Sequence, residues 1–187
     1  FFGQGFGRLL READARAAGA TVFGYTVKDP ERYGVVDMDA DGKVLSIEEK
    51  PAAPRSNHAI TGLYFYDGRA SQFAKTLKPS SRGELEITAL NQRYLDEGAL
   101  HVKLLGRGFA WLDTGTHDSL IQAGELIRTL EQRQGLRIGC LEEIAYSQGW
   151  IDNDQLAALG RAQGKSEYGR YLQLLASGAL AADEPAE

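Results

Sequence analysis

Residues 106–117 read GRGFAWLDTGTH, and this stretch carries more information about the fold than any other part of the chain. An apolar, strand-like segment leads into the carboxylate of Asp113, and a helical pattern follows from Asp118 to Leu130. Ligands and metals bind where the strands of an α/β sheet end and helices begin, so the pattern predicts an α/β fold with Asp113 at its site. The structural alternative is that Asp113 only caps a helix or organises a turn.

A second charged feature lies upstream, where Glu48-Glu49-Lys50-Pro51 closes another predicted strand. In one interpretation Glu49 and Lys50 form a surface ion pair. In the other, Glu49 accepts hydrogen bonds from hydroxyl groups while Lys50 meets a phosphate as a point charge. The occurrence of this feature together with Asp113 favours the handling of a phosphorylated, metal-bound substrate.

The front of the chain alternates strand and helix patterns. The strongest short-range signal is Asp41-Gly42 between two β-rich runs, which predicts a β-hairpin. Ser81 and Glu84 have the spacing of a capping box and predict a helix that runs through Leu95. A further helix is expected at residues 7–18, ending at Gly19. Strands are expected at residues 20–27, 34–39, 43–49, 59–66, 100–105 and 109–112.

The rear of the chain has helical patterns only. Asp152 and Gln155 form a second candidate capping box, and the acidic tail at residues 181–187 is expected to be disordered. Short helices are expected at residues 141–146, 155–162 and 168–175. A β-rich front followed by an all-helical rear predicts an α/β domain with a C-terminal helical extension.

Composition excludes several classes of function. The 187 residues are 43% hydrophobic and 25% charged, as in ordinary globular proteins, and the net charge of −5 argues against nucleic acid as a partner. No apolar run approaches the roughly 20 residues that span a bilayer, so we expect a cytoplasmic protein without membrane contact. Cys140 is the only cysteine, which excludes an internal disulfide. Because the chain begins with Phe1 rather than Met, we expect a fragment.

Several motifs in a fixed order resemble those of the glucose-1-phosphate thymidylyltransferases, within the wider sugar nucleotidyltransferases. The resemblance runs from Phe1 to about Leu175 and is most specific for the whole set. The motifs are Tyr33-Gly34-Val35-Val36, Glu48-Glu49-Lys50-Pro51, residues 61–67 (TGLYFYD), residues 82–88 (RGELEIT) and residues 106–117. The family fold is a Rossmann-like α/β nucleotidyltransferase sheet with C-terminal helices, which would be incomplete here at its N-terminus.

The resemblance implies roles for individual residues. Gly34, next to Tyr33, would let the backbone approach a glucose ring, because glycine has no Cβ. Glu49 would hold sugar hydroxyls, with the backbone of Ile60 beside the sugar. The remaining substrate and catalytic roles would fall to Lys50 and Arg82 at the phosphates, Tyr64 near them, and Asp113 as one of two carboxylates that hold Mg²⁺.

The implied reaction joins dTTP and glucose 1-phosphate into dTDP-glucose and pyrophosphate, with Mg²⁺ as the cofactor. The resemblance also implies a homotetramer and a secondary, regulatory nucleotide site that Arg107, Arg137 and Glu143 match in part. Residues 1–134 would form the sugar-phosphate-binding part and residues 135–187 the helical region. The family's glycine-rich triphosphate loop and second Mg²⁺ carboxylate would lie upstream, so we expect the chain alone to be inactive.

Two other functions stay open at this point. The first is a uridylyltransferase or another sugar-1-phosphate nucleotidyltransferase, because the residues that would read the base are not in the chain. The second is a non-catalytic module for sugar-phosphate binding or oligomerisation. The genomic sequence directly upstream would distinguish an enzyme from such a module.

Overall fold

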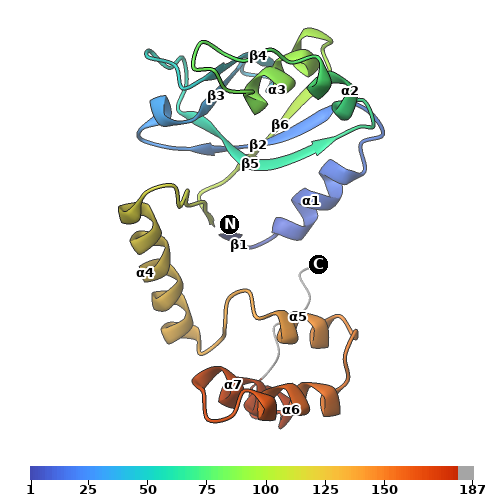
Figure 1. The fold of residues 1–187 in the computed structure, drawn as a ribbon, viewed down its shortest axis with the longest axis vertical. Helices are drawn as coiled ribbons and strands as arrows, with labels where there is room; N and C mark the ends of the chain where they lie inside the picture. The colour runs from blue at the N-terminus through green and yellow to red at the C-terminus, as the bar shows by residue number, and fades with distance from the viewer. Residues whose placement is uncertain (181–187) are drawn as a thin grey trace. The chain divides into compact units, whose positions relative to one another are not determined.

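The computed structural model describes residues 1–180 and divides the chain into two compact units, Phe1–Trp111 and Leu112–Glu187. The first unit holds every strand in this part of the chain, and the second holds helices (Figure 1). This division follows packing. The functional boundary expected after residue 134 stays a prediction.

The first unit is built on a five-stranded sheet with the order β4-β3-β5-β2-β6. Only β2 and β6 run parallel, whereas β2–β5, β3–β5 and β3–β4 are antiparallel. A separate two-stranded sheet pairs β1 with β7. The strands are β1 (Phe2–Gly3), β2 (Ala20–Thr26), β3 (Gly34–Met38), β4 (Val44–Glu49), β5 (His58–Tyr66), β6 (Leu100–Leu105) and β7 (Phe109–Ala110).

Helices cover both faces of this sheet, with α1 (Phe6–Asp14) on one side and α2 (Ala70–Lys75) and α3 (Ile87–Asp96) on the other (Figure 1). The alternation of side chains along β2 explains the two layers. Val22 packs with Leu90 and Tyr94 of α3, whereas the next residue, Phe23, packs with Ala13 of α1. A short 3₁₀ turn, η1 (Pro30–Arg32), precedes β3.

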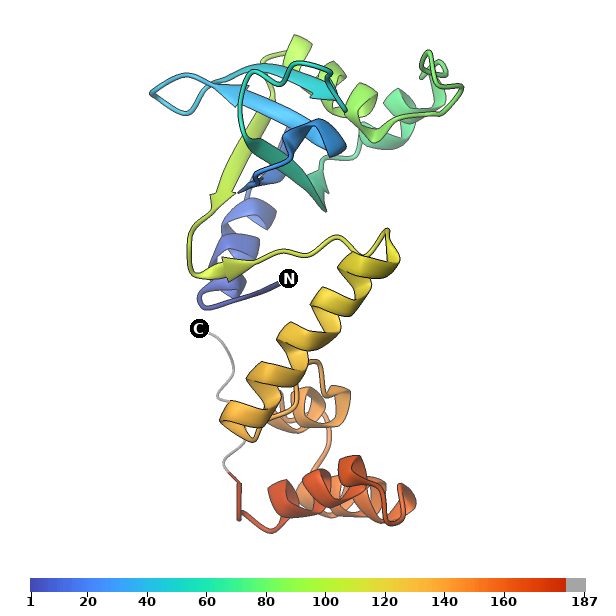
Figure 2. The same cartoon turned by 90° about the vertical axis from the view of Figure 1, so that its left-hand side faces the viewer.

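Most expected elements are present, and the predicted hairpin is confirmed. β3 and β4 pair directly, and Gly42 has a φ of 79° in the turn between them. The hairpin is drawn in light blue in Figure 2, where its turn projects beyond the sheet. α1 ends at Asp14, earlier than expected, and β7 covers only Phe109–Ala110 of the expected strand. α2 was not predicted.

The capping box predicted at Ser81 and Glu84 is wrong. α3 begins only at Ile87, and its N-cap is Glu86, whose side chain makes no capping hydrogen bond. The backbone before the helix forms a turn instead, in which the Ser80 amide donates to the Glu84 carbonyl at 2.8 Å. Gly83 takes a φ of 80° within this turn, so the chain cannot be helical there.

The second unit contains four helices in its described part, and α4 runs as one long helix (Figure 2). Its core consists of Cys140, Leu156, Leu172 and neighbouring residues of the last three helices. The capping box of Asp152 and Gln155 is confirmed at the start of α6. The bounds are α4 (His117–Gln134), α5 (Leu141–Ser147), α6 (Asn153–Ala162) and α7 (Glu167–Ala176).

None of the helices between residues 1 and 180 combines the length and the apolar character needed to cross a membrane. The predicted tail at residues 181–187 lies outside the described residues.

Candidate functional site

The hairpin brings two of the predicted site residues opposite each other. β3 begins at Gly34 and β4 ends at Glu49, and these two residues are register partners. The pairing continues one residue further, because the Lys50 amide donates to the Tyr33 carbonyl at 3.0 Å. The motifs around Gly34 and Glu49 therefore meet at one end of the hairpin, as a shared site requires.

The carboxylate of Glu49 lies where the hairpin, β5 and α3 converge. Thr88, in the first turn of α3, donates a short hydrogen bond from its hydroxyl to Oε2 of Glu49. A Cβ added at Gly34 would lie 3.1 Å from the Thr88 hydroxyl, 3.4 Å from Glu49 Oε2 and 4.0 Å from the Cβ of Ile60. A side chain at Gly34 would therefore crowd the Thr88 hydroxyl and the Glu49 carboxylate, so the close packing of these residues depends on glycine at this position.

Arg82 brings positive charge to the same carboxylate. Its Nη1 atom lies 3.8 Å from Glu49 Oε1 and 3.5 Å from Glu86 Oε1, and its Nη2 atom lies 2.8 Å from Glu84 Oε2. The Arg82 side chain is 41% exposed, so solvent and ligands can reach it. A guanidinium has five N–H donors, and these ion pairs leave some of them for an incoming anion.

Tyr64 of β5 also faces this region. Burial raises the pKa of its phenol, and the negative charge of Glu49 raises it further. The phenol therefore keeps its proton at neutral pH and can donate a hydrogen bond. Its ring stacks on Tyr66 at 5.9 Å between centroids, which fixes its orientation.

Lys50 follows directly after Glu49 and has an unusual backbone. Its φ of 42° is the only positive value at a non-glycine residue in the described part of the chain. Side chains with a Cβ rarely adopt this conformation, and such residues concentrate at functional sites. The exposed ammonium of Lys50 thus starts from a constrained position at the end of β4.

The first unit brings together Gly34, Glu49, Ile60, Tyr64 and Arg82, with Lys50 and Tyr33 adjoining through the hairpin. Asp113 belongs to the second unit, so its proximity to Glu49 stays a prediction. The carboxylate of Asp113 is exposed, and its Oδ2 would lie 3.2 Å from a Cβ added at Gly115. Thr116, not Asp113, caps α4, so the capping role considered for Asp113 is excluded.

Sequence reasoning missed two residues beside the site, Thr88 and Trp111. Trp111 packs edge-on against Tyr33, with ring centroids 5.1 Å apart, and also against Tyr25 at 6.0 Å. Both residues lie inside motifs singled out above, at 82–88 and 106–117. The only signal for Thr88 and Trp111 in the sequence was their position in those motifs. Their contacts depend on tertiary folding and could not be predicted from one segment.

The three residues matched to a regulatory site fall in both units. Arg107 lies in the loop between β6 and β7, whereas Arg137 and Glu143 belong to the second unit. Tyr171 connects the latter two, because its hydroxyl donates to Glu143 at 2.6 Å and accepts from the Arg137 amide at 3.2 Å. The regulatory role of the three stays a prediction.

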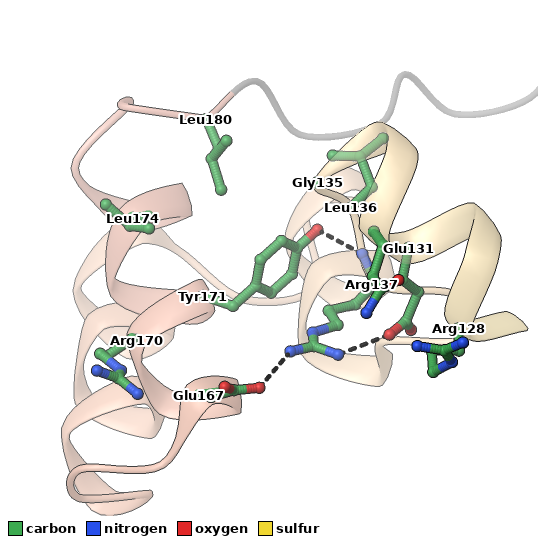
Figure 3. Close-up of a pocket in the computed structure, with 11 residues that line it drawn as sticks. Arg128, Glu131, Gly135, Leu136, Arg137, Glu167, Arg170, Tyr171, Leu174 and Leu180 are labelled. Carbon is green, nitrogen blue, oxygen red and sulfur yellow. Dashed lines mark hydrogen bonds and ion pairs between the residues drawn. The ribbon is translucent and has the colours of Figure 1, made fainter.

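Within residues 1–180, no cluster of three or more His, Cys, Asp or Glu side chains could hold a metal by itself. The second unit also contains an open groove of about 780 Å³, which lies between α4, the segment after it and α7 (Figure 3). This groove is separate from the Glu49 cluster in sequence and in the unit to which it belongs.

Comparisons with known proteins place these features in a family. A family model described as nucleotidyl transferase matches residues 1–129. A glucose-1-phosphate thymidylyltransferase of Xanthomonas campestris pv. campestris is 61% identical over 176 residues, which are 94% of this chain and 60% of that protein. The enzyme of the same name from Neisseria meningitidis is 55% identical over 172 residues, or 92% of this chain and 60% of the relative.

A solved structure gives the same result. It is a candidate glucose-1-phosphate thymidylyltransferase from Bacillus anthracis in complex with a sucrose, with 44% identity and a TM-score of 0.58. The match covers 65% of this chain and 48% of that one. The chain spans about 60% of the length of the curated relatives that it matches.

Proposed function

This chain belongs to the nucleotidyl transferase family, and from that membership we propose that it is the sugar-phosphate-binding part of a glucose-1-phosphate thymidylyltransferase. The enzyme would form dTDP-glucose and pyrophosphate from dTTP and glucose 1-phosphate. The names of the relatives at 61% and 55% identity support this choice. The observation that carries it is the Glu49 cluster, in which a carboxylate, the backbone of Gly34 without a side chain, and a cation lie together.

The cluster suits a sugar phosphate because its parts match the two ends of that ligand. Glu49 accepts hydrogen bonds from sugar hydroxyls, and Gly34 leaves room for the ring to approach the backbone. Ile60 supplies the apolar wall. At the other end, Arg82 and Lys50 neutralise the phosphate, and the protonated Tyr64 can donate to it.

The reaction needs positioning and charge neutralisation more than a nucleophilic side chain. A phosphate oxygen of glucose 1-phosphate attacks the α-phosphorus of dTTP, a new P–O bond forms, and the bond to the leaving pyrophosphate breaks. Arg82 and Lys50 would hold the attacking phosphate against the charge repulsion of the triphosphate. Orientation of this kind contributes a large part of the rate in bimolecular reactions.

The described residues offer a carboxylate, that of Asp113, that suits Mg²⁺ as a ligand. Mg²⁺ takes oxygen ligands and uses one or two carboxylates, with water and substrate phosphates completing its shell. The exposed Asp113 carboxylate forms no hydrogen bond or ion pair within residues 1–180, so it is free to serve as such a ligand. When bound, the ion would supply charge neutralisation at the phosphates. We further propose a cytoplasmic homotetramer that uses neither nucleic acid nor membrane as a partner.

The test of the proposed function is glucose 1-phosphate binding by Arg82→Gln. A charge-assisted hydrogen bond is worth about 1.5–3 kcal/mol, so affinity should fall roughly tenfold or more. Arg55→Gln is the matched control, because Arg55 lies in the exposed segment between β4 and β5 and pairs with Glu48 rather than Glu49, at 3.3 Å. Equal affinity in the two variants, measured by calorimetry, would contradict the proposed site.

The metal assignment has its own test in the protein completed with its upstream segment. Asp113→Asn keeps the shape of the side chain and removes its charge. The activation free energy of Mg²⁺-dependent pyrophosphate release should therefore rise by several kcal/mol, and the rate should fall accordingly. Asp118→Asn, in the first turn of α4, is the control. Near-normal turnover of Asp113→Asn at saturating Mg²⁺ would exclude Asp113 as the ligand.

A further inference from the structure

The groove of the second unit is large enough for a small molecule. Its volume of about 780 Å³ lies within the range of about 300–1,000 Å³ that is usual for ligand sites. It lies between the C-terminal part of α4, the segment after it and α7. None of the residues to which the proposed catalytic function was assigned lines it.

Ion pairs fix one wall of the groove. The Arg137 guanidinium pairs with Glu131 of α4 at 2.6 Å and with Glu167 of α7 at 3.5 Å (Figure 3). The hydrogen bond that Arg137 donates to Glu131 is the main cause that raises the pKa of Arg137, so the guanidinium stays charged. The Tyr171 hydroxyl accepts from the Arg137 amide at 3.2 Å and ties α7 to the same segment. The groove therefore has a defined shape between two helices.

Two more guanidiniums line the same groove without partners. Arg128 of α4 and Arg170 of α7 form no side-chain hydrogen bond or ion pair with any residue from 1 to 180. With Arg137, three guanidiniums face the two carboxylates of Glu131 and Glu167. One positive charge remains in excess, although the whole chain carries a net charge of −5.

The other part of the groove is apolar. Leu136, Tyr171, Leu174 and Leu180 contribute to its lining, and Figure 3 shows Leu174 and Leu180 on the side away from Glu167 and Arg170. Leu174 is 46% exposed, so a ligand in the groove can cover its side chain. The groove thus presents a cationic end and an apolar end to one ligand.

We propose that this groove binds an amphipathic monocarboxylate, that is, a singly charged carboxylate on an aromatic or aliphatic body. The planar guanidinium of Arg170, which lies on the same helix and the same side of the groove as Leu174, matches a carboxylate in geometry, whereas Arg128 lies on the opposite, α4 side (Figure 3). The single excess charge of the lining matches the single negative charge of the ligand. The body of the ligand covers the leucines and the face of Tyr171. A triphosphate, with its several charges, is a poorer match to this balance. This site is independent of the proposed transferase function.

The probe is 3-phenylpropionate, titrated into the whole 187-residue chain and followed by NMR shifts of the groove residues. Acetate and 3-phenylpropanol are the ligand controls, since each lacks one half of the probe. We expect saturable binding of 3-phenylpropionate, and binding at least roughly tenfold weaker for each control, because the charged and apolar contacts each contribute.

Substitutions locate the site. Arg170→Gln should weaken binding of 3-phenylpropionate roughly tenfold, because it removes a charge-assisted hydrogen bond, whereas Arg128→Gln, on the opposite side of the groove, should weaken it less. Arg133→Gln is the matched control, since it lies on the same helix but does not line the groove. All three variants replace an exposed side chain, and thermal unfolding checks that they fold like the unaltered chain. Absence of binding at millimolar probe, equal binding of the alcohol, or equal affinity in the three arginine variants would each overturn the proposal.

Discussion

Glu49 is the residue through which the proposed sugar site acts. Thr88 holds one of its oxygens, and Arg82 lies 3.8 Å from the other, so the carboxylate is oriented before a ligand arrives. The hydroxyls of a sugar can then donate hydrogen bonds to a carboxylate that is already in position. This arrangement favours discrimination between sugars over general affinity for phosphate.

Replacement of Glu49 by Ala should therefore reduce discrimination. The preference for glucose 1-phosphate over its deoxy analogues should fall by about 1.5–3 kcal/mol, because the analogues no longer leave a charged acceptor unpaired. Glu48→Ala is the control, since Glu48 faces Arg55 on the exposed side. Competition binding with each deoxy analogue measures the ranking. An unchanged ranking in Glu49→Ala would make Glu49 a structural residue.

At Lys50, the effect of backbone conformation on stability can be separated from the effect of the charge on phosphate binding. In the left-handed region a residue with a Cβ is strained by about 1–2 kcal/mol, and glycine is not. Lys50→Gly should therefore be more stable than Lys50→Ala by about 1 kcal/mol, while both lose affinity for the phosphate. Chemical unfolding and calorimetry on the same samples test the two effects. Equal unfolding free energies would show that the φ of 42° is not strained in solution.

At the scale of elements, two glycines in helices of the second unit have opposite surroundings. An added Cβ at Gly124, inside α4, meets nothing within 4 Å, whereas at Gly169 of α7 it would lie 2.7 Å from Gln163 Cβ and 2.8 Å from the Gly160 carbonyl. Gly169 therefore permits the close approach of α6 and α7.

Substitution with Ala should separate these two cases. Gly124→Ala should stabilise the protein by about 1 kcal/mol, since alanine favours a helix more than glycine does. Gly169→Ala should destabilise it by about 1–3 kcal/mol, because a backbone atom cannot move aside easily. Unfolding midpoints in urea give both values. A stabilised Gly169→Ala variant would mean that the Cβ has more room than the 2.8 Å to the Gly160 carbonyl oxygen, and so that α6 and α7 lie further apart in solution.

Local signals predicted the elements well where one short pattern determines the structure. The turn at Asp41-Gly42 and the cap at Asp152 both formed, because each pattern satisfies its own backbone. Ser81 and Glu84 matched the same capping pattern and failed, since Ser80 and Gly83 close a competing turn. Pairing order was beyond local signals: neither the parallel β2–β6 pair nor the place of β5 between β3 and β2 follows from one segment.

The site divides in the same way. Gly34 and Glu49 could be brought together from the sequence, because a hairpin fixes its own register. Thr88 could not, since its contact with Glu49 depends on how α3 packs across the sheet. Arg128 and Arg170 are 42 positions apart in the sequence, and no local pattern indicates that both line the same groove.

At the scale of the whole molecule, substrate binding and turnover should separate. The chain contains the Glu49 cluster, yet it spans about 60% of the length of its curated relatives. We expect the 187 residues to bind glucose 1-phosphate but to make no dTDP-glucose, because in our proposal the contacts that orient dTTP belong to the remaining part of such enzymes. Orientation of two reactants is worth roughly 7–11 kcal/mol in favourable cases, so its loss should bring turnover below detection.

The measurement compares the chain as given with a chimera that carries the N-terminal segment of the Xanthomonas campestris relative. Both receive dTTP, glucose 1-phosphate and Mg²⁺, and pyrophosphate release is followed beside calorimetric binding of glucose 1-phosphate. The chimera should turn over, and the short chain should only bind. UTP in place of dTTP tests the base preference of the chimera. Clear turnover by the short chain would contradict the proposal, because the nucleotide would then have to bind within these 187 residues.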